Sequence, residues 1–315
     1  MADEPRTISA SPGLTGAHGA RDAARASALK FFFITGHPRS GTNWMTNILN
    51  LHPKVYARGE FHFDVLRTAM DIFVDRAWHV ACAEPTRSEA ERAFQDLVRR
   101  TMATIAPEKP GAAWIGDQTP RMFVPLVPGA PTFLIERDGR DVLVSLTFHW
   151  LLVDGVPAGG GRATLAKHRE MFRRDPNHFK AHPDELLTSE TWVRHAAREW
   201  AMFVRHDREM VRRMLASEVD GRVCVVRYEQ LHEDIEAART MMYEFLGLDP
   251  DEALPLSTSP KAEPGRKGEE NPLGHLRAGK VRGWEKYFTD DAKAWFKAEA
   301  GTALIDMGYE QDLNW

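Results

Sequence analysis

Two kinds of hydrophobic pattern alternate along this chain. Short apolar runs such as Phe31–Ile34 and Pro131–Ile135 have the length and composition of buried strands. Longer segments repeat apolar residues every three or four positions, which predicts amphipathic helices. Helices are expected at residues 42–51, 64–80, 88–105, 141–149, 192–215, 235–246 and 290–307, and further strands at 112–116 and 222–227. Strands separated by helices favour a parallel sheet with crossover helices on both faces, in a single domain.

Two segments lack such a pattern. Residues 1–28 are small and polar, with no apolar stretch of the kind that signal peptides contain, so we expect a disordered tail ahead of a domain at 29–315. Residues 154–188 are rich in glycine, proline and histidine and show little periodicity. Structureless loops of this length are usually functional or disordered, so we predict a mobile substrate lid within 150–190.

Composition limits the function classes. The net charge of −4 argues against a broad nucleic-acid-binding surface. No apolar run approaches the roughly 20 residues that a membrane-spanning helix requires. Cys82 and Cys224 are the two cysteines in 315 residues, so disulfides are not expected to hold the fold together. These features predict a cytoplasmic protein.

The segment from Gly36 to Trp44 joins the first strand to the first helix. A helix start offers unsatisfied backbone N–H groups and the positive end of the helix dipole to an anion. Gly36 and Gly41 have the spacing of a nucleoside-triphosphate loop, but the lysine that should follow the second glycine is absent. Arg39 is the cation within the loop, and an arginine can hold phosphate-like oxygens without a metal. We therefore predict a P-loop-containing three-layer α/β/α fold with a central parallel sheet, transferring a less charged group such as sulfuryl.

Two further segments carry candidate anion ligands. Arg137 lies at a strand end and Ser145 two helical turns later, which suits a second phosphate, although Arg140 and Asp141 beside them could form plain surface ion pairs. Residues 277–289 combine basic and glycine residues with an aromatic cluster. They could form either a basic loop pinned to the core or a flap that closes over a phosphate.

Taken together, these segments resemble the sulfotransferases that use 3′-phosphoadenosine 5′-phosphosulfate (PAPS). Residues 37–44 (His-Pro-Arg-Ser-Gly-Thr-Asn-Trp) are similar to the family's 5′-phosphosulfate loop, and Arg137 and Ser145 have the spacing of its 3′-phosphate ligands. Residues 227–231 (Arg-Tyr-Glu-Gln-Leu) and the flap 277–289 resemble two further family segments. The resemblance implies PAPS as donor, no metal, and the donor-binding residues Arg39, Ser40, Gly41, Thr42, Asn43, Trp44, Arg137, Ser145, Tyr228, Arg277, Ala278 and Gly279.

The chain also departs from the family pattern. The enzymes that sulfate phenols and steroids carry a catalytic histidine where residues 117–120 here read Asp-Gln-Thr-Pro, and their dimer motif is not retained. The chain is therefore more similar to the divergent bacterial, carbohydrate and protein-tyrosine branches. Several of those place a glutamate base in a Gly-Glu pair after the first helix, a placement that Gly59–Glu60 fits.

Three residues are candidates for the general base that takes the proton of an acceptor hydroxyl. Glu60 is the first choice and would act with Arg39, which stabilises the leaving group; His62 and Asp117 are the alternatives. Glu60 could instead form a structural ion pair with Arg58 or Arg137. The predicted reaction is in-line sulfuryl transfer to a small-molecule or carbohydrate hydroxyl. A P-loop kinase-like phosphotransferase and a non-catalytic nucleotide-binding relative remain alternatives, and the oligomeric state stays open.

Overall fold

The computed structural model describes residues 29–77, 84–153, 162–263, 273 and 279–315. Its sheet has five parallel strands in the order β2-β3-β1-β4-β5. The strands are β1 (Lys30–Thr35), β2 (Val55–Arg58), β3 (Trp114–Gln118), β4 (Pro131–Glu136) and β5 (Arg222–Arg227). Because all strands are parallel, the loops that follow them meet at one edge of the sheet. The predicted sheet is confirmed, and β2 is an addition because its four residues are too few to show a period.

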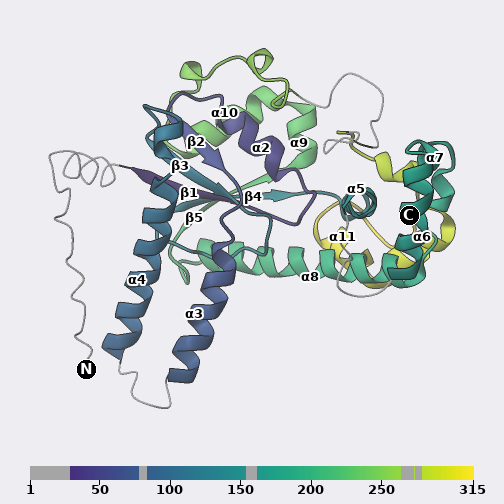
Figure 1. The fold of residues 1–315 in the computed structure, drawn as a ribbon, viewed down its shortest axis with the longest axis horizontal. Helices are drawn as coiled ribbons and strands as arrows, with labels where there is room; N and C mark the ends of the chain where they lie inside the picture. The colour runs from purple at the N-terminus through teal and green to yellow at the C-terminus, as the bar shows by residue number, and fades with distance from the viewer. Residues whose placement is uncertain (1–28, 78–83, 154–161, 264–272, 274–278) are drawn as a thin grey trace, which may run out of the picture.

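Helices cover both faces of the sheet (Figure 1). Phe32 and Ile34 of β1 point to a core shared with α2 (Thr42–Leu49), α9 (Tyr228–Glu233) and α10 (Ile235–Phe245). Phe33, between them in sequence, points to the opposite core. The helices on that side are α3 (Phe63–Ala77), α4 (Glu84–Ala103) and α8 (Glu190–Leu215). This alternation follows from the period of two in a strand and confirms the three-layer prediction.

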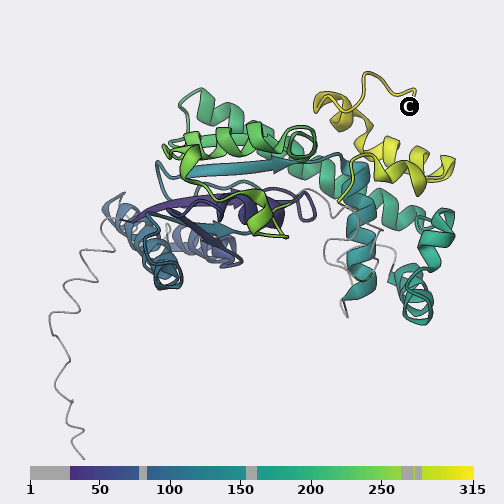
Figure 2. The same ribbon diagram turned by 90° about the horizontal axis from the view of Figure 1, so that it is seen from above.

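A second group of helices lies beyond the end of the sheet where β4 finishes (Figure 2). It contains α5 (Gly139–Leu152), α6 (Arg162–Arg174), α7 (His178–Ala181) and α11 (Asp290–Asp306), packed with α8 around one apolar core. The sequence interpretation of residues 154–188 as structureless was wrong for the described part, from residue 162 onward. Leu165, His168 and Phe172 are buried at helical spacing in α6. Whether this segment is a substrate lid stays a prediction.

Short 3-10 helices complete the chain: η1 (Ala106–Glu108), η2 (Pro183–Glu185), η3 (Pro250–Glu252), η4 (Leu256–Thr258) and η5 (Gly283–Lys286). None of the described helices is long and apolar enough to cross a membrane. The predicted tail at 1–28 and the flap residues Arg277 and Ala278 lie outside the described residues.

Candidate active site

The loop between β1 and α2 has the features of an anion cradle. Gly41 is the N-cap of α2 with φ 109°, no side chain caps the helix, and its first turn holds no acidic residue. A Cβ atom at Gly41 would lie 2.6 Å from the ring of Tyr228, so only glycine fits both the space and the left-handed backbone. Ser40 and Thr42 are buried, whereas Asn43 is exposed in the first turn of α2. The positive helix end thus receives no negative charge from its own side chains, as a bound phosphate requires.

Arg137 joins three of the predicted segments. It follows β4, is 9% exposed, and donates hydrogen bonds to the carbonyl oxygens of Arg39 (3.0 Å) and Lys280 (3.2 Å). Its guanidinium lies 3.9 Å from the centre of the Tyr228 ring, a cation–π contact. The Nε atom is buried and has no hydrogen-bond partner. A buried guanidinium with an unpaired N–H donor fits an anionic ligand, because leaving such a donor unpaired costs about 1–3 kcal/mol.

Arg39 connects the first loop to α5. Its Nε donates to Ser145 Oγ at 3.3 Å, so two segments far apart in sequence meet as predicted. Arg39 has φ 74°, a backbone conformation that costs a non-glycine residue on the order of 1 kcal/mol. The hydrogen bonds made by its carbonyl and side chain offset that cost. The structure therefore holds this arginine inside the loop and beside α5.

An aromatic cluster forms the wall behind the loop. The ring centroids of Trp44 and Tyr228 are 5.4 Å apart, and His232 contacts both rings. Trp44 Nε1 donates to the Ala262 carbonyl at 2.9 Å. Burial lowers the pKa of His232 to about 4, so this imidazole is neutral near pH 7. The wall presents rings but no additional charge.

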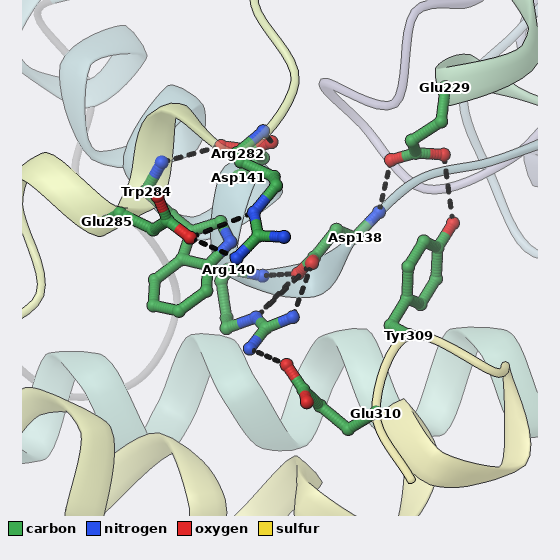
Figure 3. A network of polar contacts seen from close by, with 9 residues as sticks. All are labelled: Asp138, Arg140, Asp141, Glu229, Arg282, Trp284, Glu285, Tyr309 and Glu310. Atoms are coloured by element: carbon green, nitrogen blue, oxygen red, sulfur yellow. Dashed lines mark hydrogen bonds and ion pairs between the residues drawn. The ribbon is translucent and has the colours of Figure 1, made fainter. Parts of the chain in front are cut away.

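A buried polar network joins the start of α5 to η5 (Figure 3). The Asp141 carboxylate accepts hydrogen bonds from the backbone N–H groups of Arg282 (2.9 Å) and Trp284 (2.8 Å), which ties η5 to α5. Burial raises the Asp141 pKa to about 6. Arg140 is paired with Asp138 and also with Glu310. Both Arg140 and Asp141 are 3% exposed, so the alternative of plain surface ion pairs is wrong.

Residues 59–62, which contain the predicted base, follow β2. The Glu60 side chain is 37% exposed and that of His62 is 58% exposed, with 3.4 Å between Glu60 Oε2 and His62 Nε2. Arg58 pairs with Glu108 instead, and Arg137 is engaged on the donor side. Among the described residues, Glu60 forms neither of the structural ion pairs considered for it.

The end of β3 links the two sides. Gln118 Nε2 donates to Thr42 Oγ1 at 3.0 Å, and a Cβ atom at Gly59 would lie 2.3 Å from the Gln118 carbonyl oxygen. Asp117 is buried and accepts hydrogen bonds from the Phe61 N–H and the Thr119 hydroxyl, and burial raises its pKa. Asp117 is thus engaged in positioning residues 59–62, which leaves Glu60 as the more accessible carboxylate. Sequence reasoning missed Gln118, although its place at a strand end was the available signal.

The flap is described only in part. Gly279 has φ 54°, and the next residue, Lys280, provides the carbonyl that Arg137 contacts. The structure thus brings together the loop, Arg137, Ser145, Tyr228 and the described end of the flap. Among the described residues, no group of three or more His, Cys, Asp or Glu side chains is arranged to hold a metal ion.

The family model described as "Sulfotransferase family" matches residues 32–252, well over half of the chain. This chain belongs to the sulfotransferase family. Mouse sulfotransferase SULT7A1 complexed with PAP has a similar structure, at 13% identity and a TM-score of 0.46, covering 90% of this chain and 88% of that one. A sulfotransferase from Alicyclobacillus acidocaldarius is similar at 16% identity and a TM-score of 0.45, covering 90% and 95%. No curated protein sequence matches.

The family match confirms the predicted family and enzyme class.

Proposed function

We propose that this sulfotransferase moves a sulfuryl group from PAPS to a hydroxyl of a small-molecule or carbohydrate acceptor by in-line displacement. The observation that carries the proposal is the position of Arg137. Its guanidinium contacts the loop carbonyl of Arg39, the flap carbonyl of Lys280 and the ring of Tyr228, and it retains an unpaired Nε donor. A donor with one phosphate on the loop and a second near Arg137 would engage all of these segments at once.

Each donor-side residue has a distinct role in this proposal. The N–H groups at the start of α2 hold the 5′-phosphate, and Arg39 stabilises negative charge on the oxygen that leaves with adenosine 3′,5′-bisphosphate (PAP). Arg137 and Ser145 hold the 3′-phosphate, and Trp44 and Tyr228 border the nucleotide. Arg277, Ala278 and Gly279 would close the flap. No step requires a metal, because a sulfuryl group carries less charge than a phosphoryl group.

Glu60 acts as the general base. The transfer needs one proton to leave the acceptor hydroxyl, and a carboxylate partly open to solvent can reach an incoming acceptor. His62 lies beside Glu60 and can share the proton. In-line displacement then depends on the alignment of the two sides, which the contacts of Gln118 with Thr42 and Gly59 support.

A sulfuryl-transfer assay tests the proposal. Labelled PAPS is incubated with the protein and a panel of phenols and sugars, with EDTA present throughout. The expected result is label on at least one hydroxyl acceptor and release of PAP. A parallel reaction with ATP and Mg²⁺, without EDTA, tests the alternatives: a P-loop kinase-like phosphotransferase would transfer phosphate there, and a non-catalytic relative would bind PAP without turnover in either reaction. Either of those results would overturn the proposed function.

A further inference from the structure

The segment that follows α11, residues 309–315, contacts elements that border the proposed donor site. It lies outside the range 32–252 that the family model matches. Figure 3 shows the side chain of Tyr309 directed at α9 and that of Glu310 directed at the start of α5. Trp315 contacts both α5 and η5. These three elements carry or adjoin the proposed ligands of the 3′-phosphate.

Tyr309 supports the aromatic contact of Arg137. Its hydroxyl donates to Glu229 Oε2 at 3.2 Å, while Glu229 Oε1 accepts from the backbone N–H of Asp138 at 3.1 Å. Glu229 is the sequence neighbour of Tyr228, whose ring lies against the Arg137 guanidinium. Asp138 is the sequence neighbour of Arg137 itself. The Tyr309 hydroxyl therefore holds the carboxylate that joins the two partners of this contact through their neighbours.

Arg140 lies in a corner between two tryptophan rings. Its guanidinium carbon is 4.0 Å from the centroid of the Trp284 ring and 4.5 Å from that of the Trp315 ring. The two rings are 6.0 Å apart, with 79° between their planes. The carboxylates of Asp138 and Glu310 pair with the same guanidinium. A cation held by two rings and two carboxylates is fixed in position, and it fixes the rings in turn.

The position of Trp284 sets the backbone that contacts Arg137. The Trp284 N–H donates to Asp141 Oδ1 at 2.8 Å, and the Arg282 N–H donates to Asp141 Oδ2 at 2.9 Å. Lys280, two residues before Arg282, provides the carbonyl that accepts from Arg137 Nη2 at 3.2 Å. A shift of Trp284 would therefore move the Lys280 carbonyl relative to Arg137.

Trp315 is in turn anchored on α11. Its ring centroid lies 6.4 Å from that of Phe296. Its carbonyl accepts from Lys297 Nζ at 2.8 Å, and the same ammonium lies 4.8 Å from the centroid of the Trp315 ring. Because Phe296 and Lys297 both belong to α11, that helix determines where the ring meets Arg140.

We infer that Trp315, acting through Arg140 and Trp284, is a positioning residue for the 3′-phosphate side of the donor site. Its ring bounds Arg140, which holds the Trp284 ring and with it the backbone around Lys280. Loss of the Trp315 ring loosens the Lys280 carbonyl that orients Arg137. The loop at the start of α2 is bound by other contacts and keeps its shape. This inference rests on the proposed function, since it takes Arg137 as a ligand of the 3′-phosphate.

Calorimetric titration with PAP and with adenosine 5′-monophosphate (AMP) tests this role. AMP lacks the 3′-phosphate, so it does not engage Arg137 in the proposed site. Trp315→Leu is expected to raise the PAP Kd about tenfold and the AMP Kd less than about twofold, because only the 3′-phosphate contact is misplaced. Trp315→Phe keeps a ring against Arg140 and should return the PAP Kd to within about threefold of the original value.

Two further variants separate positioning from a loss of stability. Trp295, which also lies on α11, is a partly buried tryptophan packed against the same apolar core. Among the described residues it is not one of the rings against Arg140. Trp295→Leu should therefore lower the Tm and leave the PAP Kd unchanged. Glu310→Gln keeps the shape of the side chain but removes its charge from Arg140, and should raise the PAP Kd about three- to tenfold.

The inference is overturned if Trp315→Leu and Glu310→Gln both bind PAP as the original protein does, or if Trp315→Leu weakens PAP and AMP equally. It is also overturned if Trp295→Leu weakens PAP binding as much as Trp315→Leu. Where Trp315→Leu does not fold, the PAP and AMP affinities of Glu310→Gln decide. An original protein that binds PAP no more tightly than AMP is a different result, which would overturn the proposed function instead.

Discussion

The proposed donor and acceptor sides of the site differ in how firmly the chain holds them. On the donor side, Arg137 is 9% exposed and fixed by two backbone carbonyls and an aromatic ring. On the acceptor side, the side chains of Glu60 and His62 are 37% and 58% exposed. The Asp117 carboxylate holds the backbone N–H of Phe61, whereas the side chains of Glu60 and His62 stay open.

This difference matches what each side must recognise. A sulfuryl donor with two phosphates is bound best by a rigid site. Hydrogen-bond donors that are already in position do not have to reorganise when the ligand binds. An acceptor side with open side chains leaves room for a variable hydroxyl compound. The two sides should therefore respond differently to mutation.

Glu60→Gln should separate chemistry from binding most strongly. Without the base, kcat is expected to fall by about 10²–10⁴-fold, the usual contribution of general base catalysis. The PAP Kd should stay within twofold, since Glu60 lies on the acceptor side. His62→Gln is the matched control and should lower kcat less than tenfold. Near-normal turnover in Glu60→Gln would remove Glu60 as the base.

Arg137→Ala should instead weaken the binding of PAP. Loss of charge-assisted hydrogen bonds to the donor is expected to raise the PAP Kd by about 100-fold, and Arg39→Ala by about tenfold. Calorimetry measures both values, and a thermal melt checks that the buried Arg137 can be removed without unfolding. Arg58→Ala removes an exposed arginine paired with Glu108 and should leave the PAP Kd unchanged. Unchanged PAP affinity in both Arg39→Ala and Arg137→Ala would contradict the donor assignment.

Gly41→Ala tests the shape of the cradle. The new Cβ atom would meet the Tyr228 ring at 2.6 Å, so we expect a loss of about 1–3 kcal/mol in the free energy of unfolding, together with weaker PAP binding. Gly111→Ala is a matched control, because Gly111 also has a left-handed backbone (φ 98°) but no atom within 4 Å of the added Cβ. Equal destabilisation in both variants would show that backbone strain alone matters.

The pH dependence of stability tests the buried polar network around Asp141. The Asp141 pKa is raised from 3.8 to about 6 by burial, with Arg137 and Asp138 as its charged neighbours. Between these values the folded protein binds more protons at Asp141 than the unfolded chain does. Its contribution to stability is therefore full below pH 4 and is lost as the pH rises to 6.

Denaturant unfolding of the original protein and Asp141→Asn at several pH values measures this contribution. The difference between the two free energies of unfolding should shift by on the order of 2 kcal/mol against the original protein from pH 4 to pH 7. A difference that does not change with pH would show that Asp141 titrates normally.

The meeting of the loop, Arg137 and Ser145 could be predicted from sequence because each part is local. Gly36, Arg39 and Gly41 lie in one short loop. Arg137 lies at a strand end, and Ser145 follows it two helical turns later. Backbone geometry then places them at the same edge of a parallel sheet. The same reasoning predicted most strands and helices, whose apolar periods are long enough to recognise.

The parts of the site that sequence did not predict depend on contacts between distant segments. Gln118 gains its importance from its hydrogen bond to Thr42 and from the close approach of Gly59 to its carbonyl oxygen. No spacing of residues along the chain indicates such contacts. Helix α6 was missed for a related reason, since three buried positions among many polar residues give only a weak periodic signal.

Titration of PAP and of ATP into the protein, each with EDTA and with Mg²⁺, distinguishes a metal-independent bisphosphate site from a nucleoside-triphosphate site. A cradle built from Arg39, Arg137 and the start of α2 should bind PAP at least tenfold more tightly than ATP, with the same Kd in EDTA and in Mg²⁺. Tighter binding of ATP, or PAP binding that appears only with Mg²⁺, would contradict a metal-independent bisphosphate site.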